Sequence, residues 1–300
     1  MKLNRYLWVW TTSDVLRNTG TFINNLTGLE INHIFLYVRE LEYTTLENEL
    51  STFISSMSRH NIKVWGLNGD RSFLSDGVGP IPIYNSVNNL IAYNKRQTSV
   101  NNKFYGFQTD IEPADTVDFK SFHSGVADSK LNTNSGGIWQ STEKADRYKL
   151  MESWLSIHDT IKKKLKSHSV QFGAALPWWI DDYNGEPLST IYKGKLDTVF
   201  HHFSLILDEM HFMTYNTYPT NVINRMISKL KYLSNTTVKV CASMETVTGI
   251  GEYISYADTL TKNSKSSVVA DLIEIQDGLL YGNFNGICIH DYNGFISLEN

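Results

Sequence analysis

Eight short runs of apolar or alternating residues, separated by stretches of helical spacing, set the strongest constraint on the fold of this chain. The clearest helical stretch is 149–166, where an apolar stripe lies opposite lysines. Eight strands alternating with helices predict an α/β fold, a (β/α)8 TIM barrel with residues 1–300 as one domain. The strand-like runs are YLWVW (6–10), HIFLYV (33–38), IKVWGL (62–67), FYGFQTDIE (104–112), VQFGAAL (170–176), MHFMTY (210–215), VKVCASME (238–245) and GICIHDY (286–292).

Composition narrows the possible partners. A chain of 300 residues with 41% hydrophobic content can bury the core of such a barrel. A formal net charge of -4 argues against nucleic acid or an anionic membrane, since neither attracts an acidic surface. The sequence has no apolar run of about 18 residues to span a membrane and no nucleotide-binding loop, so we expect no cofactor. The first ten residues lack the apolar region of a signal peptide, and localisation stays open.

Side-chain alternation divides four of the runs into an outward and an inward face. Outward residues of a barrel pack beneath helices, and inward residues fill the lumen and surround the site. The outward residues are Ile34, Leu36, Val38, Tyr105, Phe107, Thr109, Ile111, Val238, Val240, Ala242, Met244, Ile287 and Ile289. The inward residues are Phe35, Tyr37, Arg39, Gly106, Gln108, Asp110, Glu112, Lys239, Cys241, Ser243, Glu245, Cys288, His290 and Tyr292. A purely structural lumen would instead hold branched aliphatic residues, so this polar set predicts a functional site.

Three long connections follow predicted strands at their carboxyl ends. They are residues 113–146, 69–86 and 178–188. Long loops in a compact domain are usually functional, and barrel enzymes keep their sites on this face. We therefore expect the site at the carboxyl end of the barrel.

Asp110 and Glu112 are the residues most indicative of chemistry. Both point inward from one strand end, so their repulsion raises one carboxyl pKa and provides a proton donor near neutral pH. Glu245 adds a third carboxylate across the mouth. Such a group suits protonation of a glycosidic oxygen. The competing interpretation is an ion-paired rim, in which Arg39 neutralises one carboxylate.

The run YGFQTDIE (105–112) resembles the strand-four signature of the family 18 chitinase-like glycoside hydrolases, commonly written DGFDLDWE. The segment MTYN (213–216) is similar to the family's M-x-Y-[DN] element. The resemblance implies that Glu112 is the general acid, that Asp110 orients it and the substrate's 2-acetamido group, and that Tyr215 holds the acetamido carbonyl. Tyr105 and Gln108 stand where the family has aspartates, and His290-Asp291-Tyr292 occupies the strand end that usually carries a tryptophan.

A second resemblance gives a different nucleophile. Ile111-Glu112-Pro113 together with Glu245 looks like the retaining clan A glycosidases, which would make Glu245 the nucleophile and Glu112 the acid/base. The segments METV, ISYAD and GICIHDY also resemble uncharacterised barrels related to glycoside hydrolases. These resemblances agree on Glu112 and leave the nucleophile open.

Other residues are candidates for contacts with a sugar. Aromatic faces stack on sugar rings, so Trp10 and Trp178 are possible platforms. His211 is expected to be a hydrogen-bonded core residue, and Cys241 and Cys288 to be buried free thiols. The full set of expected substrate-binding residues is Tyr215, Asn216, Trp10, Arg39, Trp178, His290 and Tyr292.

The sequence thus predicts a glycoside hydrolase acting on an oligo- or polysaccharide, with Glu112, Asp110 and Glu245 as catalytic residues and no metal. Two alternatives remain. One is an inactive barrel that binds glycans or a protein. The other is a metal-dependent phosphodiesterase, with a cation held by carboxylates and His290 at the mouth.

Overall fold

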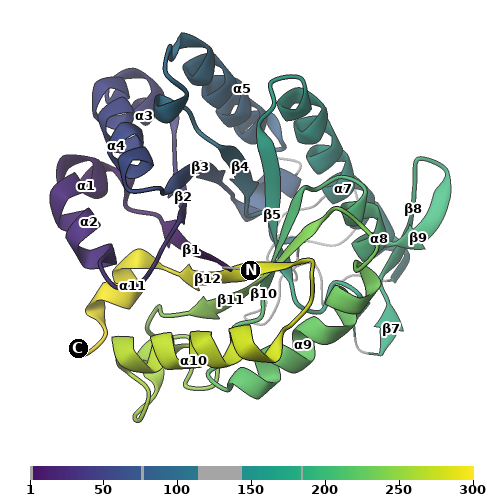
Figure 1. The fold of residues 1–300 in the computed structure, drawn as a ribbon. Helices are drawn as coiled ribbons and strands as arrows, with labels where there is room; N and C mark the ends of the chain where they lie inside the picture. Colours follow the sequence, from purple (N-terminus) through teal and green to yellow (C-terminus); the bar gives the residue numbers. More distant parts are fainter. Residues whose placement is uncertain (1–2, 76–77, 114–143, 184) are drawn as a thin grey trace.

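The computed structural model describes residues 3–75, 78–113, 144–183 and 185–300. Eight parallel strands close into a barrel in the order β1-β12-β11-β10-β5-β4-β3-β2 (Figure 1). This confirms the predicted (β/α)8 barrel. The strands are β1 (Asn4–Val9), β2 (His33–Tyr37), β3 (Lys63–Asn68), β4 (Gly106–Thr109), β5 (Gln171–Pro177), β10 (Glu209–Met213), β11 (Lys239–Glu245) and β12 (Phe284–His290).

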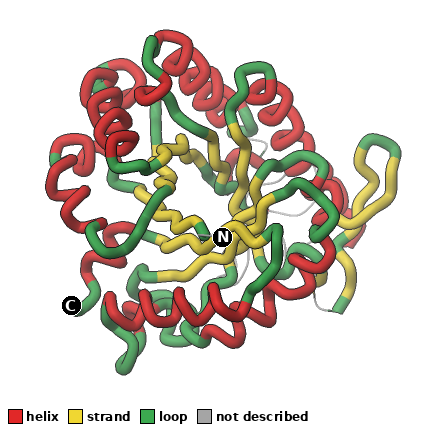
Figure 2. Tube along the Cα trace, in the orientation of Figure 1, coloured by secondary structure: helices red, strands yellow, loops and turns green. Residues whose placement is uncertain are grey.

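Helices surround the barrel on its outside, as Figure 2 shows in red around the yellow strands. None of the described helices is long and apolar enough to cross a membrane. The helices are α1 (Thr12–Arg17), α2 (Thr19–Leu26), α3 (Glu40–Thr44), α4 (Glu47–Arg59), α5 (Ile81–Arg96), α7 (Lys144–Lys166), α8 (Val199–Ser204), α9 (Pro219–Tyr232), α10 (Lys265–Gly278) and α11 (Tyr292–Ser297).

The predicted long loops carry small elements of their own. The connection after β3 contains a short 3-10 helix, η1 (Arg71–Leu74), before α5 begins. The connection after β5 forms two hairpins, β6 (Asp182–Tyr183) with β7 (Glu186–Pro187) and β8 (Ser189–Tyr192) with β9 (Lys195–Thr198). Most of the expected loop 113–146 lies outside the described residues.

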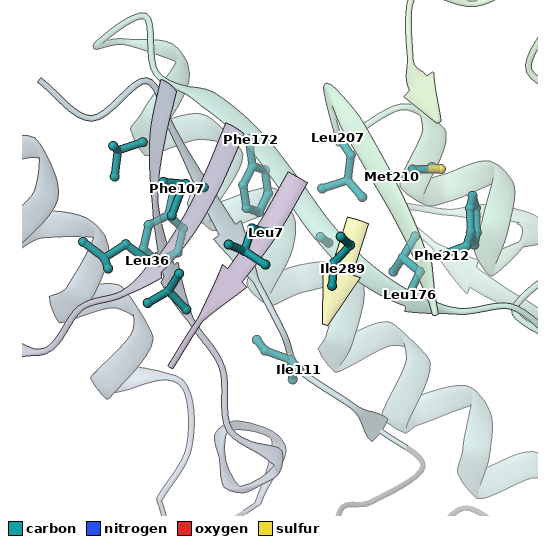
Figure 3. Packing of buried hydrophobic residues seen from close by; sticks show 14 of the residues in the cluster. Leu7, Leu36, Phe107, Ile111, Phe172, Leu176, Leu207, Met210, Phe212 and Ile289 are labelled. Atoms are coloured by element: carbon teal, nitrogen blue, oxygen red, sulfur yellow. The ribbon is translucent and has the colours of Figure 1, made fainter. Parts of the chain in front are cut away.

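The main hydrophobic core lies between the strands and the surrounding helices. Alternate residues of the strands fill it, among them Leu7, Leu36, Phe107 and Ile289 (Figure 3). Every residue of the predicted outward set except Tyr105 and Thr109 belongs to this core. Burial of these side chains is the main force that holds each strand in its register, because a slip of one residue would turn the apolar face inward.

A second core fills the lumen and is built largely of rings. Its members are Tyr6, Trp8, Phe35, Trp65, Leu67, Ala175, Cys241 and Cys288, with Trp10, Tyr37 and Met213 packed against them. The predicted orientation of Tyr105 was wrong. Tyr105 precedes the first residue of β4, and its ring packs 5.2 Å from Trp65 and 5.8 Å from His33 at the amino end of the barrel.

Candidate active site at the barrel mouth

Six of the predicted site residues meet at the carboxyl ends of the strands. Trp10 follows β1, Asp110 and Glu112 follow β4, Glu245 ends β11, and His290 ends β12. Tyr215 follows β10, and its ring centroid lies 5.8 Å from that of His290. The negative charges of Asp110 and Glu112 both act on its hydroxyl. The barrel therefore brings together, at one mouth, residues that are far apart in sequence.

Asp110 and Glu112 flank Ile111, which points the other way. Ile111 is buried in the outer core (Figure 3), whereas Asp110 and Glu112 are partly exposed. Strand β4 ends at Thr109, so alternation does not fix the direction of the two carboxylates, but the charges of both raise the pKa of Tyr215 at the mouth. The backbone of Asp110 is held by a bond from its N–H to the carbonyl of Asn68, 3.1 Å long.

Gly69 makes room for the end of strand β4. A Cβ atom at this position would lie 2.0 Å from the carbonyl oxygen of Asp110 and 2.6 Å from its Cβ. Such distances are far below van der Waals contact, so a side chain at 69 would displace Asp110. The glycine is needed here for close approach of two backbones.

Glu245 is deeply buried, and both of its carboxylate oxygens accept hydrogen bonds. Its Oε1 accepts the backbone N–H of Thr246 at 2.8 Å and that of Val247 at 2.9 Å. The imidazole Nδ1 of His290 lies 3.1 Å from Oε1 and 2.9 Å from Oε2. The Glu245 side chain is 3% exposed. This carboxylate is therefore arranged to orient His290.

His290 in turn holds Trp10. The indole N–H of Trp10 donates to Nε2 of His290 at 2.9 Å. Since Nε2 accepts this bond, the ring proton lies on Nδ1 and is donated to Glu245. Burial opposes a positive charge on His290, but the bond to Glu245 and its charge outweigh burial and raise the His290 pKa. The indole N–H opposes that rise, because it occupies the nitrogen that a second proton would need.

Tyr215 keeps its phenolic proton at neutral pH. Burial, followed by the charges of Glu245, Asp110 and Glu112, raises the pKa of Tyr215 well above its usual value. A neutral phenol surrounded by carboxylates can donate a hydrogen bond to an oxygen that enters the mouth.

Arg225 of helix α9 fixes the backbone that carries Tyr215, and the sequence analysis missed it. Its Nη1 donates to the carbonyls of Thr214 at 2.7 Å and Tyr215 at 3.0 Å. The guanidinium carbon also lies 4.4 Å from the ring centroid of Trp178. One basic residue on a helix gives no signal that distinguishes it from a solvated surface charge.

Gln108 lies in the lumen below Asp110, where the resembled family has an aspartate. Its side chain is fully buried, and in the described part of the chain neither Nε2 nor Oε1 has a hydrogen-bond partner. Gly173 provides the space for it, since a Cβ there would lie 2.2 Å from Oε1. An amide without a protein partner at this depth is costly.

A groove of about 410 Å³ extends from the mouth along the ends of β2 and β3. Tyr37 lines it, and its ring packs 5.3 Å from that of Trp10. Arg39 also lines it, but it does not point into the lumen as predicted. Arg39 immediately precedes helix α3, its side chain is 54% exposed, and it pairs with Glu42 at 3.1 Å instead of with a mouth carboxylate.

One further prediction of position was wrong. Tyr292 begins helix α11 and lies in the outer core, 4.7 Å from the ring of Phe22, where its hydroxyl accepts from Asn25 at 2.9 Å. Strand β12 ends at His290, so the alternation used for the prediction does not extend to 292. Trp178, a possible sugar platform, lines a separate groove between the β5 end and helix α9.

Asn216 is directed away from the mouth residues. It is 7% exposed, and its Oδ1 accepts from the N–H of Tyr218 at 3.0 Å and from Asn221 at 3.1 Å. These bonds stabilise the turn that leads into helix α9. Asp291 likewise has a local role, since its Oδ1 accepts the N–H of Gly294 at the start of α11.

The sequence matches no protein-family profile and no curated protein. The structure is similar to solved chitinases over nearly its whole length. A chitinase from Bacteroides thetaiotaomicron superposes with a TM-score of 0.54 at 12% identity, covering 98% of this chain and 91% of that one. A GH18 chitinase from Cycas revoluta in complex with (GlcNAc)3 superposes with a TM-score of 0.56 at 10% identity, covering 98% of this chain and 96% of that one. A chitinase from Chromobacterium violaceum superposes with a TM-score of 0.50 at 11% identity, covering 100% of this chain and 96% of that one.

At these identities the similarity establishes the fold alone: the chain forms a barrel of the kind seen in these chitinases. The resemblance read from residues 105–112 and 213–216 is confirmed at this level.

Proposed function

We propose that the protein is a glycoside hydrolase in which Glu112 donates the proton to the glycosidic oxygen and Asp110 is its partner carboxylate. The observation that carries the proposal is that Tyr215 lies beside His290 at the mouth, where the charges of Glu245, Asp110 and Glu112 add to burial in raising its pKa. General acid catalysis needs a proton donor beside a group that stabilises developing positive charge. Asp110 and Glu112, which both follow β4 at the mouth, meet that requirement.

The substrate class follows from the state of Glu245. Its Oε1 accepts two backbone N–H groups and both oxygens face His290, so it is poorly placed to attack a sugar carbon. Without a protein nucleophile, the substrate must supply one, and a 2-acetamido carbonyl does so in substrate-assisted hydrolysis. We therefore propose an oligosaccharide of 2-acetamido sugars as substrate, with the Tyr215 hydroxyl donating to the acetamido oxygen.

Trp10 is proposed as the aromatic surface on which the sugar ring rests. It belongs to the mouth through its bond to His290 and borders the groove through its contact with Tyr37. Glu245 and His290 act on the substrate through Trp10 and are positioning residues. No step of this mechanism requires a cofactor.

Hydrolysis of two matched aryl glycosides tests the proposal. We expect release of nitrophenol from the glycoside of N,N′-diacetylchitobiose and at most a trace from the glycoside of cellobiose, which differs only in carrying 2-hydroxyl groups. Equal rates would rule out the acetamido group as nucleophile while leaving a glycosidase.

The second candidate function is binding of glycans without turnover, and Gln108 favours it. A neutral amide at this position cannot exchange a proton with Asp110, unlike the aspartate of the resembled family. Binding of chitooligosaccharides measured by calorimetry, with no reducing sugar released over a day, would support this alternative. Measurable hydrolysis would exclude it.

A further inference from the structure

A second polar cluster lies deeper in the lumen, below the mouth. Glu209 and His211 point inward from β10, and Cys241 points inward from β11. His211 and Cys241 are direct neighbours in the strand register. All three side chains are buried, as predicted for His211 and Cys241. The proposed hydrolysis uses none of them.

The spacing of these three side chains is that of a metal site. One ligand atom from each residue lies within 4.8 Å of the other two. Zinc binds carboxylate and imidazole ligands at about 2.0–2.2 Å and thiolate at about 2.3 Å, so tetrahedral ligand atoms lie roughly 3–4 Å apart. The cluster therefore needs only small shifts to enclose an ion.

The contacts of the imidazole identify the nitrogen that faces the ion. Nε2 of His211 lies 3.2 Å from Oε2 of Glu209, whereas Nδ1 lies 3.0 Å from Sγ of Cys288 on the opposite edge of the ring. Nε2 is thus the ligand beside Glu209, and Nδ1–H donates to Cys288. A histidine ligand commonly donates its second N–H in this way.

Outer contacts fix the carboxylate as well. The hydroxyl of Tyr6 donates to Oε2 of Glu209 at 2.9 Å and itself accepts from Asn285 at 2.5 Å. Hydrogen bonds to a ligating carboxylate are typical of built metal sites. The cluster has both an inner set of donors and a second layer that orients them.

Burial of these groups has a cost that an ion would offset. Moving a carboxylate and an imidazolium from water into a protein interior costs several kcal/mol for each charge. A divalent cation would neutralise the buried carboxylate of Glu209 and would also bind the thiol of Cys241 as thiolate.

We propose that Glu209, His211 and Cys241 form a zinc site inside the barrel. A carboxylate, an imidazole and a thiolate together suit zinc better than magnesium or calcium, which prefer oxygen ligands. The sequence analysis did not predict the site, because its residues come from two strands and follow no recognised ligand spacing. The ion would join β10 to β11 beneath Tyr215 and Glu245 and would be structural.

Metal analysis and cobalt substitution of the full chain test the proposal. Protein expressed with added zinc, then dialysed against a weak chelator, should retain about one zinc per chain. Removal of zinc followed by addition of Co²⁺ should give a thiolate-to-cobalt absorption band in the near ultraviolet. Cys241→Ser should lose that band and bind zinc at least about 100-fold more weakly. Because the readouts are metal content and absorption, the result does not depend on hydrolysis.

Cys288→Ser is the matched control, since it removes a neighbouring buried thiol that accepts from His211. It should keep the cobalt–thiolate band and bind zinc only about 10-fold more weakly. A wild-type chain that folds, retains less than about a tenth of a zinc per chain and gives no thiolate band would overturn the proposal. A band that survives Cys241→Ser but disappears in Cys288→Ser would overturn the assignment of Cys241.

Discussion

The Nδ1 atom of His290 lies 2.9 Å from Oε2 of Glu245, and this bond separates the roles of the mouth carboxylates. The side chain of Glu245 is 3% exposed, and its carboxylate accepts hydrogen bonds from His290 and from two backbone N–H groups. Asp110 and Glu112 are partly exposed at the same mouth. The acid chemistry is therefore expected from Asp110 and Glu112, which follow β4, and Glu245 at the end of β11 supports it by orienting His290.

Replacement of Glu112 by Gln should remove hydrolysis while the fold remains. Loss of a general acid lowers kcat by about 10²–10⁴-fold. The loss should be much smaller with a dinitrophenyl glycoside, whose leaving group departs without protonation. Glu49→Gln, at an exposed site on α4, is the matched control and should be neutral. An unaltered rate in Glu112→Gln would remove Glu112 from the mechanism.

Replacement of Glu245 by Ala distinguishes a positioning residue from a nucleophile. We expect kcat to fall by about 10²-fold, because Trp10 and His290 lose their orientation. Added azide should not restore activity, and no glycosyl azide should form. Azide rescue with formation of that product would instead identify Glu245 as the nucleophile of a retaining pair.

The pKa of His290 should respond in opposite directions to its two partners. In the folded chain it lies above the usual value of 6.5, and NMR titration of the ring protons can measure it. Glu245→Gln removes the stabilising charge and should lower this pKa. Trp10→Phe removes the competing indole N–H and should raise it.

The raised pKa of His290 also determines the direction in which its contribution to the unfolding free energy changes with pH. The folded state holds the proton more tightly than the unfolded state, so the contribution is complete below pH 6.5 and is lost as pH rises through the folded pKa. The difference in unfolding free energy between wild type and His290→Gln should therefore shrink with rising pH. A difference that grows in that direction would contradict the assignment.

Gly69→Ala should disrupt the end of strand β4. The added methyl group would lie 2.0 Å from the carbonyl oxygen of Asp110, so the backbone must move. We expect a loss of about 1–3 kcal/mol in unfolding free energy and a large loss of activity. Gly20→Ala, in helix α2 with no atom within 4 Å, is the control and should be neutral or stabilising. Denaturant unfolding and kcat measure both effects.

Protonation of the buried His158 should destabilise the folded chain in acid. It is fully buried on α7, accepts from the hydroxyl of Thr109 at 2.9 Å and donates to the carbonyl of Trp154 at 2.8 Å. Burial lowers its pKa from 6.5 to about 4. Its contribution is therefore present above pH 6.5 and falls as pH drops toward 4, by on the order of 3 kcal/mol. His158→Gln should be less stable at pH 7 and should lose less stability on acidification. His168→Gln, at an exposed site, should behave as wild type.

The barrel was predictable because the alternation of side chains can be seen within each short strand of the sequence. Each strand alternates between an apolar outer face and a distinct inner face, and this pattern placed Asp110, Glu112, Glu245 and His290 on the lumen side. The prediction failed at Arg39, Tyr105 and Tyr292, which lie just beyond the ends of β2, β4 and β12. Alternation describes a pleated strand, and outside the strand the chain turns freely.

The contacts that organise the site were not predictable in the same way. Trp10 and His290 are far apart in sequence, and only closure of the barrel between β1 and β12 brings them within 2.9 Å. Arg225 acts through main-chain carbonyls, which have no sequence signature of their own. The zinc ligands we propose on β10 and β11 depend on the register between two strands.

The ring-filled lumen has an evolutionary consequence. Large flat side chains such as Trp8, Phe35 and Trp65 touch one another edge to face, so a change in one tilts its neighbours. The uppermost ring of this stack is Trp10. Substitutions in the buried rings would therefore tilt Trp10, and a change in the proposed sugar platform need not begin in the rim loops.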